Sequence, residues 1–388
     1  MSLPGLCLDG FDRNGLSTPR RALGVGHRWR GPCRRVAVKI ATIRRAREAG
    51  APRSTLHPDV TGLSDVPLSV LDLAPVTEDG SARQSLRNTL DLARHTDALG
   101  FHRYWVAEHY NLPGIASTAT PVLIAEVAAA TERIRVGSGG VMLPNHAPLI
   151  VAEQFGTLEA LHPGRIDLGI GRAPGTDPRT AMAVRGTRGA DDFPQQLNEL
   201  TAYFRPDPGR AVNAVTAPGN EPPVWLLGSS DFSATLAGRL GLPFAFAHHF
   251  SARNTEPALR AYRDAFRPSS ACERPHVMLG VSVVCADTDE RARELALPSL
   301  VGHLSLRRGR PIPLPSPKAA SGMAASAAAK EYVDKRLDTG FIGSQDTVRA
   351  KLDSLLADTG ADELMVTTMV YDHADRRRSY ELLAKLAG

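Results

Sequence analysis

Short apolar runs rich in β-branched and aromatic residues recur from Val66 onward, each followed by a segment with helical spacing. After the first run, Leu86, Leu90 and Ala93 fall near the helical period, and Gly100 ends the pattern. Strands that alternate with helices in this way are typical of a parallel sheet covered by helices. Eight such units favour a closed (β/α)8 barrel (TIM barrel) over the alternative, an open doubly wound sheet. The predicted strands are 68–73, 103–107, 134–138, 166–171, 224–228, 244–247, 277–285 and 363–367.

The alternation is interrupted once, before the last strand. A proline-rich stretch runs from Arg310 to Pro317, and an alanine-rich run follows it, ahead of a helical pattern at 345–358. We interpret this segment as an insertion loop. In a barrel, function is carried where the strands end and in the loops that follow. We therefore expect those loops and this insertion to choose the substrate, which the sequence does not identify.

Residues 1–65 differ from the rest of the chain in charge and in pattern. Positions 1–53 hold 12 Lys and Arg against 3 Asp and Glu, a net +9, whereas the remaining residues hold 34 against 38, a net −4. The segment shows neither helical nor strand periodicity, so we expect a disordered basic N-terminal extension ahead of a barrel domain at 66–388. Because the barrel itself is acidic, we do not expect it to bind nucleic acid.

Apolar stretches and cysteines both favour a soluble cytoplasmic protein. The longest apolar stretches, such as Val281 to Ala286, are far shorter than the roughly 20 residues that span a bilayer. The cysteines form no C-x-x-C pair and are too scattered for a disulfide framework or a zinc site. We therefore expect no membrane association and no metal. The four cysteines are Cys7, Cys33, Cys272 and Cys285.

Residues after the first two predicted strands could form part of a ligand site. Ala74 and Pro75 make a small corner where a flat ring could lie against the backbone. After the second strand, the run Glu108-His109-Tyr110 reaches the mouth of the barrel. His109 could act as a general acid or base, because small shifts move the imidazole pKa across physiological pH. The alternative is a strand-end histidine that only caps a loop.

A glycine-rich run follows the third predicted strand. It extends from Ser138 through Gly139, Gly140 and Met142 to His146. Glycine has no Cβ, so the backbone here could approach a planar ligand closely or adopt a strained conformation. The alternative is a simple bulge in the barrel wall.

A possible anion site arises after the fourth and fifth predicted strands. The run after the fourth strand superficially suggests a dinucleotide-binding motif, but Pro174 replaces its third glycine, which leaves Arg172 as a cation at a strand end. The fifth strand leads through Gly228, Ser229 and Ser230 into a helix, whose first N–H groups can hold an anion. Arg172 and the two serines together could bind a phosphate. The alternative is an ordinary N-cap.

Four stretches of the chain resemble the luciferase-like flavin monooxygenase family, and their combined order is specific to it. The resemblance covers Pro67 to Leu386, nearly everything except the extension. It implies the (β/α)8 barrel and a homodimer paired through helices beside the early strands, such as the helix from Pro148 to Leu161. The four stretches are Phe101 to Asn111, Arg133 to Ala147, Gly164 to Asp177 and Glu363 to Tyr371.

The resemblance also implies roles for the strand-end residues. His109 falls where the family keeps an active-site histidine near the reactive face of the flavin. Gly139-Gly140 falls where the family supports the isoalloxazine ring, often through a non-proline cis peptide. Arg172 and the two serines would bind the FMN phosphate. Gly171 stands where bacterial luciferase has a reactive cysteine, and Tyr110 where it has a second histidine, so we do not expect light emission or a long-chain aldehyde substrate.

The activity that the resemblance implies is an oxidoreductase reaction. An NAD(P)H:flavin reductase supplies reduced FMN, and dioxygen then gives one oxygen atom to a small organic substrate. Two alternatives remain open at this point. One keeps the barrel but uses a deazaflavin for hydride transfer, and the other is an FMN-binding barrel without catalysis.

Overall fold

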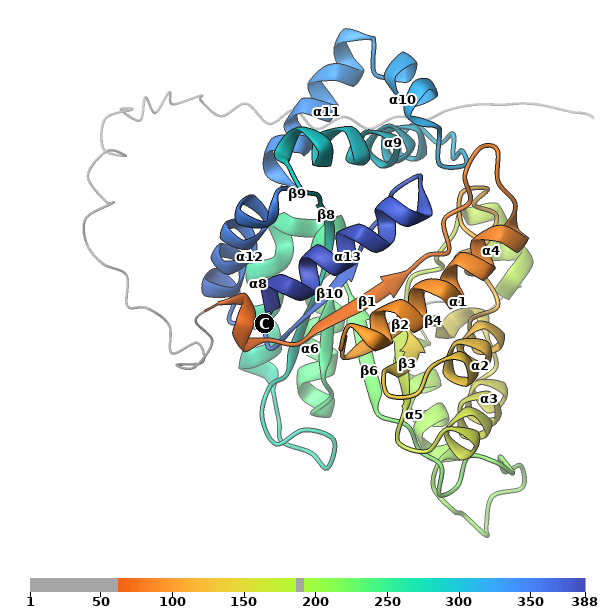
Figure 1. Ribbon diagram of the computed structural model, residues 1–388. Coiled ribbons are helices and arrows are strands. Elements are labelled where there is room, and N and C mark those ends of the chain that lie inside the picture. Colours follow the sequence, from red (N-terminus) through yellow and green to blue (C-terminus); the bar gives the residue numbers. More distant parts are fainter. Residues whose placement is uncertain (1–61, 186–191, 388) are drawn as a thin grey trace, which may run out of the picture. The chain divides into compact units, whose positions relative to one another are not determined.

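The computed structural model describes residues 62–185 and 192–387, and its strands form one parallel sheet. Seven of these strands follow one another around the sheet, and β10 pairs with both β1 and β8, which closes a barrel of eight strands (Figure 1). The predicted barrel is thus confirmed, and each predicted strand matches to within one residue. The eight are β1 (Leu68–Asp72), β2 (Arg103–Val106), β3 (Arg135–Ser138), β5 (Ile166–Gly171), β6 (Val224–Gly228), β7 (Phe244–Phe246), β8 (Val277–Cys285) and β10 (Glu363–Thr367).

Two further strands were not predicted, because both are too short to show alternation. The strand β4 (Val141–Met142) directly follows β3 and pairs with the end of β5, where Val141 lies opposite Ile170. The strand β9 (Phe341–Gly343) pairs with the last residues of β8 and lies outside the closed ring. Both extend the sheet at the carboxyl ends of the barrel strands, which is the end that carries the loops.

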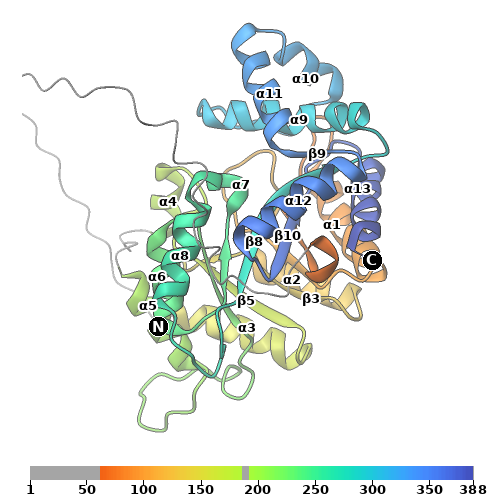
Figure 2. The same ribbon diagram turned by 90° about the vertical axis from the view of Figure 1, so that its left-hand side faces the viewer.

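Helices cover the outer face of the barrel, as Figures 1 and 2 show. The first, α1, begins where the Ser81 hydroxyl accepts a hydrogen bond from the Gln84 amide, and Gly100 follows its end at φ 84°, a conformation that favours glycine. The helices of the regular units are α1 (Ala82–Ala98), α2 (Thr120–Ala130), α3 (Pro148–Leu161), α4 (Pro178–Arg185), α5 (Phe193–Tyr203), α6 (Asp231–Leu240), α7 (His248–Ser251), α8 (Thr255–Ala265), α12 (Gln345–Thr359) and α13 (His373–Ala387).

The folded part of the chain begins earlier than the predicted boundary at Val66. Leu63–Asp65 form one turn of 3-10 helix, in which the Leu63 side chain is fully buried. The Leu63 amide donates to Asp353 Oδ1 at 2.7 Å, which ties this turn to α12. A single buried leucine gives no periodicity, so the sequence pattern did not reveal it. The rest of the predicted disordered extension, residues 1–61, lies outside the described residues.

The insertion before the last strand is mostly helical rather than a loop. The helices α10 (Pro317–Met323) and α11 (Ala327–Thr339) pack on the long helix α9 (Asp289–Arg307) (Figure 1). Alanine has the highest helix propensity, and Ser316 and Ser326 supply N-caps, which explains why the alanine-rich run is helical. The proline-rich stretch is extended, and Leu314 exchanges backbone hydrogen bonds with Val76 and Glu78. The insertion is therefore fastened to the loop that follows β1.

Large side chains fill the middle of the barrel. Leu71, Trp105, Trp225, Met278 and Met365 form one buried cluster, separate from the apolar layer between the strands and the helices. The two tryptophan rings meet edge to face with their centroids 5.4 Å apart. This layer of side chains, which we call the tryptophan tier, closes the inner end of the barrel mouth.

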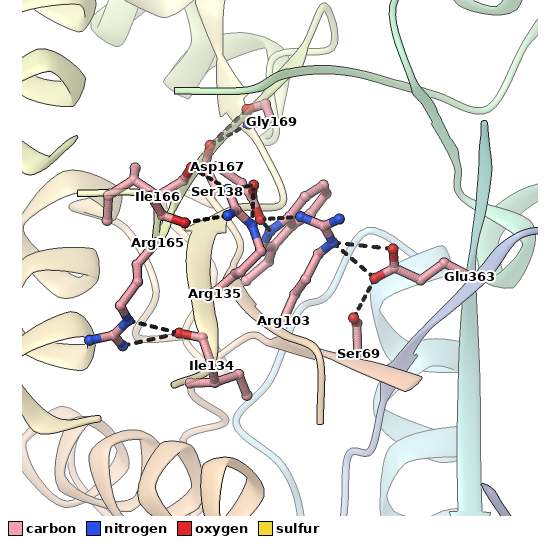
Figure 3. Close-up of polar contacts among 12 residues, drawn as sticks. Ser69, Arg103, Ile134, Arg135, Ser138, Arg165, Ile166, Asp167, Gly169 and Glu363 are labelled. Atoms are coloured by element: carbon pink, nitrogen blue, oxygen red, sulfur yellow. Dashed lines mark hydrogen bonds and ion pairs between the residues drawn. The ribbon is translucent and has the colours of Figure 1, made fainter. Parts of the chain in front are cut away.

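A network of buried charges lies nearer to the amino ends of the strands (Figure 3). Arg103 donates to Asp167 Oδ2 at 2.7 Å and to Glu363 Oε1 at 3.0 Å. Arg135 donates to Asp167 Oδ1 at 2.6 Å. Asp167 also accepts a hydrogen bond from Trp105 Nε1 at 3.0 Å. This network, which we call the charged floor, therefore holds the tryptophan tier in place. Its members are Arg103, Arg135, Asp167 and Glu363.

Candidate active site

The residues predicted to form a site come from the carboxyl ends of β1, β2, β3, β5 and β6 and from the residues directly after them. Because these strands are parallel neighbours, their carboxyl ends meet at one end of the barrel. Figure 2 shows α4 and α7, which follow β5 and β7, at this same end. The loop that holds His109 also reaches the loop after β5, where its ring contacts Gly175.

The predicted phosphate residues lie together. The Arg172 guanidinium carbon is 4.1 Å from the centroid of the Phe232 ring, in the first turn of α6. Ser230 is the N-cap of α6, and its side chain makes no capping hydrogen bond. The first N–H groups of α6 point out of the helix at its N-terminus. A negatively charged group is stabilised at this end of a helix. The Arg172 guanidinium thus lies at the N-terminus of α6, which is a place where an anion can bind.

Gly139 and Gly140 are joined by a cis peptide bond, as the family resemblance implied. A Cβ atom added to Gly139 would lie 2.6 Å from Leu71 Cδ1 and 3.3 Å from Trp105 Cβ, and one added to Gly140 would lie 2.8 Å from the Gly169 carbonyl oxygen. No larger residue fits at either position without displacing its neighbours. Gly139 therefore packs directly on Leu71 and Trp105, and Gly140 packs against the backbone of β5.

Two further predicted residues have structural roles. The buried Ser138 hydroxyl donates to the Gly169 carbonyl at 2.8 Å and accepts from the Gly169 amide at 3.0 Å, so its side chain is committed to joining β3 and β5. Ala74 is fully buried at φ 49°, and its amide donates to Asp72 Oδ1 at 2.7 Å. Of the predicted pair Ala74 and Pro75, Pro75 is the half-exposed one.

The corner after β1 is held by a buried ion pair that the sequence pattern did not reveal. Arg376 Nη2 donates to Asp72 Oδ1 at 2.7 Å, and neither side chain is more than 1% exposed. The Asp72 carboxylate also accepts from Thr89, and Arg376 Nε donates to the Thr368 carbonyl at 2.8 Å. The coulombic attraction of Arg376 and the hydrogen bonds together outweigh burial and lower the pKa of Asp72. This pair supports the strained backbone at Ala74.

His109 is half-buried at the mouth, and its Nδ1 lies 2.8 Å from the Gly175 carbonyl oxygen. A carbonyl oxygen can only accept, so Nδ1 carries the proton and Nε2 keeps its lone pair. Burial lowers the pKa of His109, against smaller opposing effects of Gly175 and Glu108, and this favours the neutral ring. The histidine therefore does cap a loop, and it still offers one free nitrogen for acid–base chemistry.

Glu108 organises this side of the mouth, which the sequence pattern did not predict. Its buried carboxylate accepts hydrogen bonds from the Met142 amide at 3.1 Å, from Asn145 Nδ2 at 3.2 Å and from His146 Nε2 at 2.9 Å. Burial and the adjacent Glu108 raise the pKa of Tyr110, whose hydroxyl also bonds this carboxylate. Glu108 thus fixes β4 and the turn after it, next to the two glycines.

Two histidines after β7, His248 and His249, were also missed. His249 Nδ1 lies 2.8 Å from the Gly280 carbonyl oxygen. In the order of strands around the barrel, β7 lies opposite β2, so His249 is on the far side of the mouth from His109. Burial lowers the pKa of His249 to about 4. The expected strand 244–247 ended just before these residues, and nothing in the sequence indicated which way their rings would turn.

Because several histidines are buried in their neutral form, we expect the free energy of unfolding to fall in mild acid. Burial lowers the pKa of His109, His248, His249 and His303 below the unfolded value of about 6.5, so the unfolded chain binds more protons. Their contribution is complete above about pH 6.5 and is lost as the pH falls toward 4, with a slope of about 1 kcal/mol per pH unit for one such group. Urea unfolding at pH 7, 6 and 5 measures this slope, and His249→Asn should flatten it. A free energy of unfolding that is constant from pH 5 to 7 would contradict this expectation.

The remaining polar groups give no sign of a metal centre among the residues described. Within 62–185 and 192–387, no three His, Cys, Asp or Glu side chains are grouped as a metal ion would require. In the same ranges, every helix is too short or too polar to cross a membrane. Cys272 and Cys285 are free, and burial raises the pKa of Cys285 to about 12, so this thiol stays protonated at neutral pH.

Comparison with known proteins identifies the family of this barrel. The model of the luciferase-like monooxygenases matches residues 66–363. The chain belongs to the luciferase-like monooxygenase family.

Three relatives match the luciferase-like barrel over most of both chains. The protein YvbT of Bacillus subtilis is 50% identical over 323 residues, which is 82% of this chain and 96% of YvbT. A luciferase-like monooxygenase of Escherichia coli strain K12 is 47% identical over 320 residues, 82% of this chain and 96% of the relative. The N-acetyl-S-alkylcysteine monooxygenase of B. subtilis is 34% identical over 335 residues, 82% and 97% of the two chains.

Solved structures share the luciferase-like fold. Apo-MsnO8 superposes with a TM-score of 0.77 at 40% identity, covering 83% of this chain and 98% of MsnO8. The oxygenating constituent of 3,6-diketocamphane monooxygenase of Pseudomonas putida, a type II Baeyer–Villiger monooxygenase in complex with FMN, gives 0.62 at 21% identity, with 83% and 98% covered. An F420-dependent secondary alcohol dehydrogenase gives 0.58 at 15%, with 84% and 99% covered. The last two likenesses concern the fold alone.

Proposed function

We propose that this luciferase-like protein is a flavin-dependent monooxygenase that uses reduced FMN and dioxygen to oxygenate a small organic substrate. The observation that carries the proposal is the convergence of Arg172 with the open N-terminus of α6, beside the bare Gly139-Gly140 backbone. The residues after β5 and β6 supply a site for a phosphate, and the residues after β3 supply a flat surface for a ring. A phosphate joined to a planar ring system is the chemistry of FMN.

The residues present fit FMN, and each would hold a different part of it. Arg172, Ser229 and Ser230 would bind the phosphate, and the N–H groups of α6 would add to their effect. Gly139-Gly140 and Pro75 would lie against the isoalloxazine ring, because a pair of glycines presents backbone without side chains. Gly228 packs against Ser233 so closely that a Cβ there would lie 2.5 Å from Ser233 Cβ, and this holds α6 in register with its strand. Met142 is half-buried beside them, where Glu108 holds its amide.

Bound reduced FMN would supply the two electrons that activate dioxygen, so that one oxygen atom enters the substrate and the other leaves as water. The protein binds and orients the reactants and limits the access of water. His109 would accept a proton at Nε2 and return it, since the Gly175 carbonyl holds its Nδ1–H. Positioned acid–base groups contribute about 10²–10⁴-fold in rate.

The partners follow from this chemistry. An NAD(P)H:flavin reductase would deliver the reduced cofactor, and the free thiols of Cys272 and Cys285 fit a reducing cytoplasm. Apolar side chains exposed on neighbouring helices support a homodimer: Val122 of α2 is 67% exposed, and Ile150 and Leu161 of α3 are 51% and 67% exposed. Such side chains are the usual material of an interface between copies.

Two alternatives keep the same site. A deazaflavin also carries a ring and phosphate, and the fold is shared with an F420-dependent alcohol dehydrogenase. It would exchange hydride with the substrate and leave dioxygen unused. A barrel that only stores FMN would bind the cofactor tightly and yield no product. The neutral His109 with its free Nε2 favours catalysis over storage.

The decisive experiment combines anaerobic binding with isotope-labelled dioxygen. The purified protein is titrated with reduced FMN and with reduced deazaflavin, and is then given ¹⁸O₂ and a panel of small thioethers and ketones, N-acetyl-S-alkylcysteines among them. We expect tighter binding of reduced FMN and one ¹⁸O atom in a product. His109→Asn, which keeps a donor for the Gly175 carbonyl, should bind reduced FMN normally and lose about 10²-fold of the product. Preferred binding of the deazaflavin with unlabelled product would replace our proposal with the hydride-transfer alternative.

A further inference from the structure

The imidazole of His249 lies inside the barrel mouth. His249 is the second residue of α7, directly after β7, and Gly280 lies in the neighbouring strand β8. Met278, two residues before Gly280, belongs to the buried cluster in the barrel, so a side chain at Gly280 would also point inward. A Cβ built there would lie 3.0 Å from both Cε1 and Nδ1 of His249. The ring therefore occupies the interior space that the glycine leaves.

The hydrogen bond of His249 fixes which nitrogen is free. Its Nδ1 lies 2.8 Å from the Gly280 carbonyl oxygen, and a carbonyl oxygen can only accept. Nδ1 therefore carries the proton, and Nε2 keeps its lone pair. His109 is held in the same tautomer by the Gly175 carbonyl. Two strand-end loops thus each use one backbone carbonyl to present a free imidazole nitrogen.

The other titratable groups that we find at this end are already committed. The Glu108 carboxylate accepts from a backbone amide, Asn145 and His146, and the Tyr110 hydroxyl bonds the same carboxylate. Arg172 is directed toward the first turn of α6 by its contact with the Phe232 ring. Among the described histidines of the mouth, His109 and His249 are the ones whose ring bonds a backbone carbonyl, which fixes the nitrogen that carries the proton.

Burial keeps His249 neutral. Desolvation lowers the pKa of the ring to about 4, the Gly280 carbonyl opposes this, and the nearby rings of His248, His109 and His303 lower it further. The influence of His109 agrees with a position across the same mouth. At neutral pH the Nε2 lone pair is available in nearly every molecule.

We infer that His249 is a second proton-transfer residue of the proposed oxygenation site, opposite His109; the inference rests on the proposed function. The reaction turns reduced FMN, dioxygen and substrate into FMN, oxygenated substrate and water, so two hydrogens of the reduced cofactor end on the oxygen atom that leaves as water. Nε2 of His249 accepts one such proton and then donates it, and the ring returns to its neutral form. His249 gains and loses one proton in each cycle, and no further reactant is needed.

Two measurements test this inference. Nitrogen-15 NMR of the protein without cofactor should show His249 protonated at Nδ1, with an unprotonated Nε2 and titration near pH 4. His249→Asn keeps an N–H donor for the Gly280 carbonyl but has no base in place of Nε2. This variant should bind reduced FMN within about twofold of wild type and lose about 10²-fold of the oxygenated product. The matched control is His248→Asn, whose ring bonds Thr255 Oγ1 at 2.8 Å and should be replaceable without loss of product.

The outcomes separate the inference from the proposed function. A proton on Nε2 in the NMR experiment overturns the role of His249, whichever cofactor the barrel uses. Wild-type yield and wild-type coupling of cofactor oxidation to product in His249→Asn overturn it as well. If the wild-type protein forms no oxygenated product, the proposed function fails and the inference fails with it. Loss of product in His249→Asn with unchanged FMN affinity, and with an active His248→Asn, supports the inference.

Discussion

Arg103→Met should lower the free energy of unfolding by about 3–5 kcal/mol, the usual cost of removing one partner of a buried ion pair. The Arg103 guanidinium lies 2.7 Å from Asp167 Oδ2 and 3.0 Å from Glu363 Oε1, and both carboxylates are at most 1% exposed. Methionine replaces the aliphatic part of the side chain but leaves two buried acids without this counter-charge. Arg135 would still pair with Asp167, whereas Glu363 would keep only Ser69 and the distant His276.

Equilibrium urea denaturation measures this loss. The matched control is Arg260→Met, which removes an arginine that pairs with Glu256 one helical turn away, where both side chains are at least 68% exposed. Exposed pairs of this kind contribute less than about 1 kcal/mol, so the control should unfold nearly like wild type. Equal midpoints for the two variants would mean that the charged floor does not stabilise the barrel.

Arg172→Ala should raise the dissociation constant for FMN about tenfold to a hundredfold and leave that for riboflavin nearly unchanged. Hydrogen bonds to a charged group contribute about 1.5–3 kcal/mol, and riboflavin has no phosphate for the guanidinium to hold. The Arg172 side chain rests on the Phe232 ring, so it is already directed toward the first turn of α6. Ser229→Ala should act in the same direction but less, because the N–H groups of the helix remain.

Flavin fluorescence quenching provides both dissociation constants. Arg239→Ala is the matched control, since it removes an exposed arginine from the last turn of the same helix. It changes the net charge equally but acts at the opposite helix end, and FMN should bind it as wild type does. Equal weakening of FMN and riboflavin by Arg172→Ala would remove the phosphate assignment, and with it the main support for FMN.

The order of the strands could be predicted because each barrel strand is a short apolar run between turn residues. The same reasoning missed strands that are too short to show an alternation of apolar and polar residues. The strands β4 and β9 have two and three residues, and both exist only because they pair with a longer neighbour. The insertion was taken for a loop because Arg310 to Pro317 dominates its composition, although helices stand on both sides of that stretch.

Sequence reasoning could place residues whose location depends only on where they stand along the chain. Arg172 and Ser230 follow adjacent strands, so parallel pairing brings them to one place whatever their side chains do. Sequence reasoning missed Glu108 and His249, because their proposed roles depend on the direction in which their side chains point. The partners that turn His109 and His249 are carbonyl groups of Gly175 and Gly280, and a carbonyl is present at every residue. No pattern of side chains in the sequence could therefore have identified these two carbonyl groups as partners.

The place of Glu363 in the chain has a consequence for biosynthesis. Glu363 opens β10, the final strand, and Leu364 pairs with Leu68 of the first strand, so ring closure joins segments from opposite ends of the domain. Until the ribosome has released this strand, β1 and β8 have open edges, and Arg103 has only Asp167 as a counter-ion. Open strand edges are prone to aggregation. The nascent barrel therefore stays incomplete, both in its backbone pairing and in its internal charge balance, until β10 has been synthesised.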